Sequence, residues 1–253
     1  MLSNNQQKYL RSLTQKKFRD KYGVFTVEGE KIVGEVLREG QIQVKNIFGL
    51  SEWFDQYGDL IKERPHIFTA ITEKELRQIS NFSTPNQVFA VLEQPQKTYD
   101  TAKLKNNYAI YLDNLQDPGN LGTIWRIADW FGFPYIFCSK GCVDWTNPKV
   151  VQASMGAFLR VPIIQQEFES LQNELPTLPT YAAVLGGENI FEHSFSKNGL
   201  LIIGNESKGI GATLQAAATH TIAIPKGKNG GAESLNAAVA TGIICGQISR
   251  FIE

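Results

Sequence analysis

Sulfur and imidazole side chains are scarce in this sequence, and their scarcity excludes several kinds of site. The 253 residues include three cysteines, three histidines and two methionines. Three cysteines are too few for the disulfide framework of a small secreted domain. The histidines are scattered without partners at ligand spacing, so neither a metal site nor a Ser-His hydrolase site is expected. Cys138 and Cys142 are better explained as a buried pair beside a strand than as half of a metal site.

Long apolar runs are missing as well. No stretch of about 18 apolar residues is present, so no membrane span is predicted. The leading residues MLSNNQQKYLRSLTQKKFRDKYG lack the apolar centre of a secretory signal. Together with the low cysteine content, this makes the cytoplasm the expected compartment.

The formal net charge of zero hides a basic leading segment. Residues 1–21 contain one acid, Asp20, and six bases, Lys8, Arg11, Lys16, Lys17, Arg19 and Lys21. Such a segment on an otherwise mildly acidic body indicates contact with a polyanion at this end of the chain. A solvated terminus explains the same charges, so charge alone leaves both interpretations open.

The remaining composition is typical of a globular α/β protein. Hydrophobic residues make up 42% and charged residues 20%, which suffices to bury a full core in one large or two smaller domains. Strand and helix patterns alternate almost throughout, which predicts the α/β class. A polar stretch around Pro95 has no apolar period and indicates a linker. We therefore expect a smaller N-terminal domain at 1–95, a linker at 96–106 and a C-terminal domain at 107–253.

Short apolar runs mark the expected strands. In the N-terminal domain they are Val24–Val27, Val44–Phe48, His66–Ala70 and Val88–Leu92. In the C-terminal domain they are more apolar, as in a parallel sheet covered on both faces: Tyr108–Leu112, Tyr135–Cys138, Tyr181–Leu185, Leu200–Ile203 and Thr221–Ile224. Helix patterns separate the second set at Leu121–Phe131, Lys149–Leu159, Phe168–Leu175 and Leu235–Ile252. Gly40 is expected to stop a helix, and Thr72 with Glu75 to form a capping box.

Three loops of the C-terminal domain place glycine with asparagine or serine between a strand and a helix, where open α/β sheets bind ligands. They begin at Asp113, Gly204 and Ile224. The second has Walker-A glycine spacing, but Ile210 and Gly211 stand where lysine and a hydroxyl residue must follow. No GxGxxG follows a strand, so neither a P-loop nor a dinucleotide fold is supported.

The three segments together resemble the signature motifs of the SpoU (TrmH-like) branch of the SPOUT RNA methyltransferases. The first matches as Asp117-Pro118-Gly119-Asn120-Leu121-Gly122 with Arg126-Ile127-Ala128, and the second as Gly204-Asn205-Glu206-Ser207-Lys208-Gly209. The third matches as Ile224-Pro225 with Ser234-Leu235-Asn236-Ala237-Ala238-Val239-Ala240. Around Lys16-Lys17-Phe18-Arg19 and Phe25-Thr26-Val27-Glu28-Gly29, the N-terminal part is similar to the ribosomal-protein-like substrate-binding domain of many members.

The resemblance implies a fold that periodicity does not show. The C-terminal domain is expected to form a deep trefoil knot, whose loops bind S-adenosylmethionine, and the protein to be a homodimer. The implied function is methylation of a ribose 2′-hydroxyl in RNA, with ribosomal RNA the first expectation and transfer RNA the alternative. The alternative to an enzyme is an RNA-binding or ribosome-assembly protein that has kept the knot but lost catalysis. No metal is expected.

The resemblance also assigns roles to residues. The implied catalytic residues are Asn120, Arg126, Glu206, Ser234 and Asn236. Arg126 keeps its proton, so a bidentate grip on a phosphate is expected of it, with the other four positioning it, the ribose and the cofactor. The implied cofactor-binding residues are Leu185, Gly204, Asn205, Glu206, Ile224, Gly227, Leu235 and Asn236. The implied RNA-binding residues are Lys16, Lys17, Arg19 and Lys21.

Simpler explanations exist for some of these residues. Asn120 and Ser234 stand where helices begin, so each could serve only as an N-cap. Arg126 could be an ordinary surface arginine, and Trp125 and Trp130 are expected to pack rather than to stack on bases. One departure from the family pattern is Lys226, which replaces the usual methionine ahead of a longer loop, 227–233.

Overall fold

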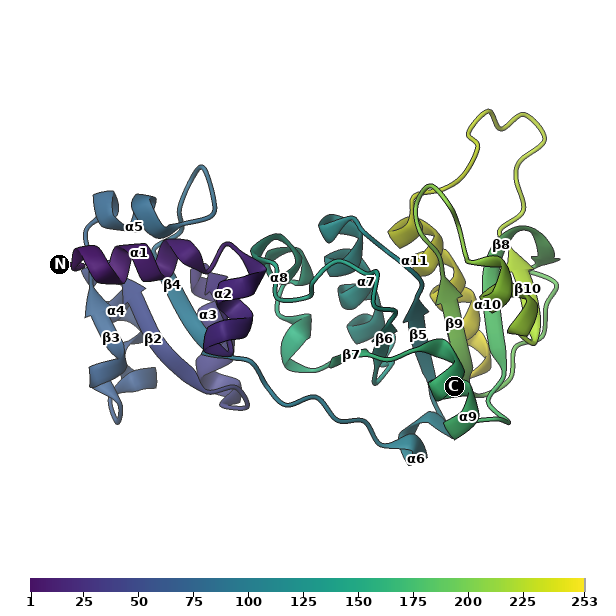
Figure 1. Ribbon diagram of the computed structural model, residues 1–253, viewed down its shortest axis with the longest axis horizontal. Helices are drawn as coiled ribbons and strands as arrows, with labels where there is room; N and C mark the ends of the chain where they lie inside the picture. The colour runs from purple at the N-terminus through teal and green to yellow at the C-terminus, as the bar shows by residue number, and fades with distance from the viewer. Residues whose placement is uncertain (253) are drawn as a thin grey trace. The chain divides into compact units, whose positions relative to one another are not determined.

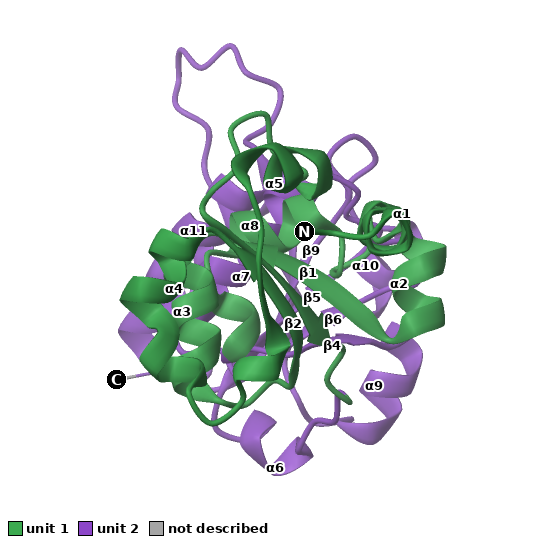
Figure 2. Ribbon diagram, turned by 90° about the vertical axis from the view of Figure 1, so that its left-hand side faces the viewer, with its two compact units in different colours: residues 1–96, 144–159 green, residues 97–143, 160–253 purple. Residues whose placement is uncertain are grey.

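The computed structural model describes residues 1–252 and divides them into two compact units (Figures 1 and 2). The N-terminal unit consists of Met1–Gln96 together with Asp144–Leu159. The C-terminal unit consists of Lys97–Val143 and the described residues from Arg160 onward. A segment within the predicted range 107–253 thus belongs to the N-terminal unit.

The N-terminal unit is built on a four-stranded mixed sheet in the order β1-β4-β2-β3. Its strands are β1 (Val24–Glu28), β2 (Val44–Gly49), β3 (Phe68–Ala70) and β4 (Val88–Glu93). Its helices are α1 (Asn4–Ser12), α2 (Lys16–Tyr22), α3 (Glu30–Glu39), α4 (Ser51–Tyr57), α5 (Glu73–Ile79) and α8 (Pro148–Ser154). The predicted helix stop at Gly40 and the capping box of Thr72 with Glu75 are both confirmed.

Helix α8 joins this unit through aromatic packing on β1. The ring of Phe25, which is fully buried, meets Trp145 at 5.3 Å and Phe158 at 5.6 Å, both edge-on. The helix ends at Met155, whose φ of 49° is left-handed. The segment Lys149–Leu159, which the sequence pattern predicted as one helix, therefore contains most of α8 and a separate short 3₁₀ turn, Ala157–Leu159.

The C-terminal unit is a six-stranded sheet in the order β10-β8-β9-β5-β6-β7, with every pair parallel. Its strands are β5 (Tyr108–Leu112), β6 (Ile136–Cys138), β7 (Ile163–Gln165), β8 (Thr180–Asn189), β9 (Gly199–Ile203) and β10 (His220–Ala223). Its helices are α6 (Thr101–Leu104), α7 (Pro118–Trp130), α9 (Phe168–Glu174), α10 (Ala212–Ala217) and α11 (Ala237–Ile248). The predicted α/β class and buried parallel sheet are confirmed.

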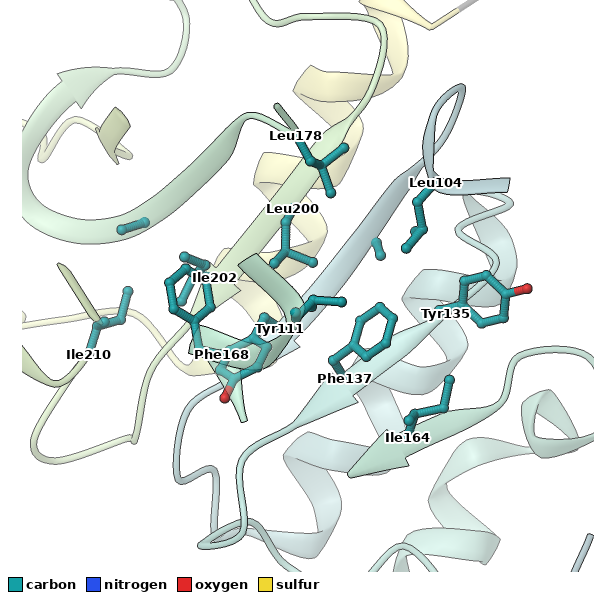
Figure 3. Close-up of a cluster of buried hydrophobic side chains, with 13 residues drawn as sticks. Leu104, Tyr111, Tyr135, Phe137, Ile164, Phe168, Leu178, Leu200, Ile202 and Ile210 are labelled. Atoms are coloured by element: carbon teal, nitrogen blue, oxygen red, sulfur yellow. The ribbon is translucent and has the colours of Figure 1, made fainter. Parts of the chain in front are cut away.

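Alternate side chains of the central strands fill the core on one face of this sheet. Tyr111, Phe137 and Ile202 pack there against Phe168 of α9 (Figure 3). Trp125 of α7 is also buried, and its indole N–H donates to the Val161 carbonyl over 2.6 Å. The packing prediction is confirmed for Trp125.

Within the chain, Trp130 does not pack as predicted. This residue is the last of α7, and 84% of its surface is exposed.

None of the helices in the described part of the chain is long and apolar enough to cross a membrane.

Candidate active site

Each of the three motif loops follows the carboxyl end of a strand of the six-stranded sheet. The first follows β5, the second follows the adjacent strand β9, and the third follows β10, which β8 joins to β9. Carboxyl ends of parallel strands lie at the same edge, which is where ligands bind in open α/β sheets. Helices α7 and α11 begin there and pack against each other (Figure 1).

A chain of side-chain hydrogen bonds joins the three loops. The amide nitrogen of Asn120 donates to Glu206 Oε1 over 3.0 Å. The amide nitrogen of Asn236 donates to Asn120 Oδ1 over 2.8 Å. Both ends of the Asn120 amide are thereby occupied, so its orientation is fixed. The structure thus brings together three predicted residues, one from each motif.

Capping does not explain Asn120 or Ser234. Asp117 caps α7, accepting from the backbone N–H of Asn120 over 2.7 Å. Asn236 caps α11, accepting from the backbone N–H of Ala238 over 2.9 Å. Ser234 lies two residues before that cap in an exposed loop. The capping residue of the third motif is therefore Asn236, which serves both the helix and the hydrogen-bond chain.

Glu206 is held as a carboxylate. Its Oε1 also accepts from the Asp117 backbone N–H over 3.1 Å. Burial pushes the pKa of Glu206 upward, but hydrogen bonds from Asn120 and from backbone N–H groups outweigh it and leave the pKa below its usual value. At neutral pH this group therefore accepts hydrogen bonds and does not act as an acid.

The lowered pKa of Glu206 predicts how the stability of the protein changes with pH. Because the folded-state pKa of Glu206 is lowered, its contribution to stability is present above the ordinary glutamate pKa of about 4.3 and is lost as pH falls through the folded value. Melting temperatures of the wild type and Glu206→Gln should differ by a constant amount above pH of about 5. The difference should shrink in more acidic buffer. A difference that grows with acid would contradict this assignment.

Arg126 stands apart from the hydrogen-bond chain. It is exposed on α7, six residues after Asn120, and no described residue accepts a hydrogen bond from its guanidinium. The structure therefore does not show the expected positioning of Arg126 by Asn120, Glu206, Ser234 and Asn236. Its five N–H donors are free for a ligand.

Two expected cofactor-binding leucines have exposed side chains. Leu185 is 80% exposed and Leu235 is 48% exposed. Leu185 lies where the ladder between β8 and β10 breaks: Thr221 pairs with Ala182, but the next residue of β10 pairs with Glu188. Residues 183–187 therefore leave the ladder and carry Leu185 outward. Ile224 is half-buried after β10, and Gly227 lies in the exposed loop beyond it.

Gly204 and Asn205 shape the second loop itself. A Cβ on Gly204 would lie 2.3 Å from the carbonyl carbon of Gly209, so only glycine fits. The Asn205 amide donates to the Asn114 carbonyl over 2.8 Å and accepts from the Ser207 backbone N–H over 3.0 Å. The structure thus gives both residues a role in holding the loop closed.

A polar hollow of about 460 Å³ lies between the first and second loops, and Glu206 is among its lining residues. Asp113, which is buried, accepts from the Gly211 backbone N–H over 2.8 Å across this hollow. Asn114 adopts a left-handed φ of 55° beside it. We assigned no role to this pair from the sequence, although a polar Asp-Asn step directly after a buried strand is the signal that identifies it.

Arg19 differs from its expected role in RNA binding. It is 2% exposed, and its guanidinium donates to Asp144 Oδ2 over 2.6 Å, to Thr146 Oγ1 and to the carbonyls of Leu13 and Thr14. Burial raises the pKa of Asp144, but Arg19 and Thr146 outweigh this and keep it below its usual value. A buried and fully engaged guanidinium cannot reach a phosphate, so Arg19 is removed from the RNA-binding set.

Comparison with known proteins identifies the chain. The profile of the SpoU rRNA methylase family matches residues 107–246, and that of the MRM3-like substrate binding domain matches residues 4–90. The chain belongs to the SpoU rRNA methylase family. It is 31% identical over 248 residues to the 23S rRNA (guanosine(2553)-2′-O)-methyltransferase RlmP of Bacillus subtilis, covering 95% of this chain and 94% of that protein.

Two solved structures resemble the SpoU chain over its whole length. A TrmH-family chain from Porphyromonas gingivalis gives a TM-score of 0.86 at 34% identity, with 99% of each chain covered. The AdoMet-bound rRNA methyltransferase from Sinorhizobium meliloti gives 0.86 at 30% identity, with 99% of this chain and 96% of that one covered. The predicted family, the class of RNA methyltransferase and the cofactor S-adenosylmethionine are confirmed.

The residues of the SpoU site fit this cofactor. Leu185, in the part of β8 that leaves the ladder, and Leu235, in the loop after the adjacent strand β10, present exposed apolar side chains, which suits the faces of an adenine ring. Loop 224–236 is exposed and supplies backbone groups around Gly227. The described residues contain no group of three or more His, Cys, Asp or Glu side chains that could hold a metal ion.

Proposed function

We propose that this SpoU-family enzyme methylates a ribose 2′-hydroxyl in ribosomal RNA. The observation that carries the proposal is the hydrogen-bond chain of Glu206, Asn120 and Asn236, which ties all three motif loops together and leaves Arg126 of α7 exposed. RlmP of Bacillus subtilis, whose name describes this reaction on 23S rRNA, matches 95% of the chain. A ribosomal substrate agrees with the predicted cytoplasmic location.

The residues would divide the work between binding and orientation. S-adenosylmethionine supplies an electrophilic methyl group when bound, and Leu185, Ile224 and Leu235 would hold its adenosine part. Glu206 stays ionised and, with Asn120, keeps the first two loops in register. A 2′-hydroxyl loses its proton poorly at neutral pH, so it must be oriented and given a proton acceptor.

Arg126 would supply that orientation indirectly. A guanidinium already carries its proton and cannot take up another. A bidentate grip on the phosphate beside the target ribose fixes the hydroxyl and leaves a phosphate oxygen to accept its proton. The exposed, unpartnered state of Arg126 suits this role, because no internal ion pair must be broken first.

We also propose that the enzyme is a homodimer through α7 and α11. Trp130, Val239 and Ile243 are exposed apolar residues on these two helices, at 84%, 52% and 36%. Ile127 of α7 lies against the backbone of Gly242, so the two helices run side by side. A second copy would cover this apolar surface and bring its own residues close to Arg126.

The dimer is tested by placing a charge on this surface. Val239→Glu should give a monomer by light scattering after size exclusion, because an unpaired carboxylate cannot be buried in an apolar interface. Thr213→Glu makes the same change on exposed helix α10 and should leave the mass unchanged. A Val239→Glu protein that elutes as the wild type would refute this interface.

The reaction is tested by supplying the purified enzyme with tritiated S-adenosylmethionine and either unmodified ribosomal RNA or transfer RNA. Label in ribosomal RNA that resists alkaline hydrolysis at one nucleotide is expected. Label only in transfer RNA would move the substrate to the alternative class. Absence of label from both, despite cofactor binding by calorimetry, would favour a non-catalytic RNA-binding protein.

The knot, the domain ranges and the RNA contacts of Lys16, Lys17 and Lys21 are parts of this proposal. All three lysines are exposed on α2, but Lys16 is paired with Asp20 at 2.6 Å. Lys17 and Lys21 are therefore the stronger phosphate ligands. Such contacts position RNA without specifying its sequence.

A further inference from the structure

Helix α2 carries an aromatic pair that packing within the unit leaves partly uncovered. The rings of Phe18 and Tyr22 are stacked, with centroids 6.5 Å apart and planes 14° from parallel. Tyr9 of α1 meets Tyr22 edge-on at 5.0 Å and 78°, which holds the Tyr22 ring in place. Tyr22 nevertheless remains 43% exposed. A rigid ring with an open surface is available for contact with another planar group.

The flexible side chains of two lysines place their ammonium groups over these rings. Lys17 Nζ lies 4.9 Å from the Phe18 centroid, and Lys21 Nζ lies 5.5 Å from the Tyr22 centroid. Neither lysine has a carboxylate partner among residues 1–252, whereas Lys16 on the same helix is paired with Asp20. Lysines and rings each recur at a spacing of four residues, so they form two adjacent stripes along α2.

A stripe of rings beside a stripe of lysines matches the chemistry of a single-stranded nucleic acid. Its bases offer planar faces for stacking, and the phosphates between them offer negative charge to flexible lysine side chains. A base paired inside a duplex has no free face, because its neighbours already stack on it. The pattern on α2 therefore suits an unpaired nucleotide better than a double helix.

We propose that Tyr22, backed by Phe18 and Tyr9, stacks on an unpaired RNA base while Lys17 and Lys21 contact the flanking phosphates. The proposal rests on the proposed function in that the bound nucleic acid is the RNA substrate. It adds a base-stacking platform, defined here as Phe18 and Tyr22, to the phosphate contacts expected of the lysines. The platform would select substrates that contain an unpaired segment.

Stacking and phosphate contacts respond differently to salt, and this separates their contributions. The probe is a ten-nucleotide oligouridine containing one 2-aminopurine, titrated with the full-length protein at three salt concentrations. Tyr22→Ala should weaken binding about 10-fold or more at each salt concentration, with the slope of log K against log salt unchanged. The double variant Lys17→Ala with Lys21→Ala should make that slope shallower by roughly 1.4, or about 0.7 per phosphate contact.

Matched variants separate stacking from folding. Tyr22→Phe keeps the ring and should bind as the wild type, whereas Tyr22→Leu keeps only an apolar side chain and should bind as Tyr22→Ala. Phe54→Ala removes another exposed ring of the same unit, on α4 between the acids Glu52 and Asp55, and should leave affinity unchanged. The melting temperature of each variant shows that it is folded. In the wild type, 2-aminopurine emission should fall on binding, and in Tyr22→Leu it should not.

Three results would overturn the platform. They are wild-type affinity in Tyr22→Ala, equal affinity of the wild type for the annealed duplex, and complete competition by polyphosphate together with 2-aminopurine emission that does not fall when the wild type binds. The last would indicate a site for polyanions in general, acidic peptides included. Methyl transfer to ribosomal RNA is measured separately. A wild type that methylates RNA while Tyr22→Ala binds normally refutes the platform alone, and a wild type that never methylates refutes the proposed function alone.

Discussion

Replacing Arg126 with alanine is expected to lower kcat and kcat/KM together by about 100-fold or more, while S-adenosylmethionine binds nearly as before. The side chain projects from α7 into solvent and takes no part in the hydrogen bonds that close the motif loops. Its removal therefore leaves the cofactor-binding loops intact and takes away only the grip on RNA phosphate. Single-turnover methylation and calorimetry with S-adenosylmethionine measure the two effects separately.

Two further variants test the physical basis of this result. Arg126→Lys should restore little activity, because a point charge cannot reproduce a bidentate fork. Arg250→Ala removes an exposed arginine outside the motif loops and should retain full activity. Wild-type turnover in Arg126→Ala would remove the residue from the mechanism.

Replacing Arg19 with alanine is expected to destabilise the protein by about 3 kcal/mol, which lowers the melting temperature by roughly 10 °C. The loss leaves the Asp144 carboxylate half-buried without its cation and two carbonyls without their donor. An uncompensated buried charge is costly even where the intact ion pair adds little net stability. Chemical or thermal unfolding of the full-length protein measures the change.

Lys16→Ala provides the matched control on the same helix. Its partner Asp20 is half-exposed, so the loss should be within about 0.5 kcal/mol. The double variant Arg19→Met with Asp144→Leu should recover part of the stability, because no unpaired charge remains. Equal melting temperatures of Arg19→Ala and Lys16→Ala would show that burial of Arg19 contributes nothing.

Local apolar pattern located every strand of the four-stranded sheet and every strand of the six-stranded sheet except β7, which has only three residues. The run Tyr108–Leu112 is short, wholly apolar and followed by Asp113, which already indicates a buried parallel strand with a ligand loop after it. Strand order, in contrast, depends on contacts between residues far apart in sequence. The break in the ladder between β8 and β10, which exposes Leu185, has no local signal except the pair Gly186 and Gly187.

In the candidate site, too, the motif residues could be predicted from the sequence, whereas contacts between distant residues could not. Asn120, Glu206 and Asn236 were expected from the motifs, and the structure joins them by direct hydrogen bonds. Arg19 was grouped with the surface lysines because charge patterning treats every cation of a basic segment alike. Its partner Asp144 lies 125 residues away, so no reading of the leading segment could have shown that it is buried.

Synthesis of the chain is affected by the discontinuity of the N-terminal unit. Domains normally fold in the order in which they leave the ribosome. Here Phe25 and Arg19 are translated early, but Trp145, Phe158 and Asp144 that cover them arrive only after β5, α7 and β6 have been made. The nascent N-terminal unit therefore keeps an uncovered aromatic ring and an unpaired cation until β5 and β6, the first two strands of the six-stranded sheet, have been made.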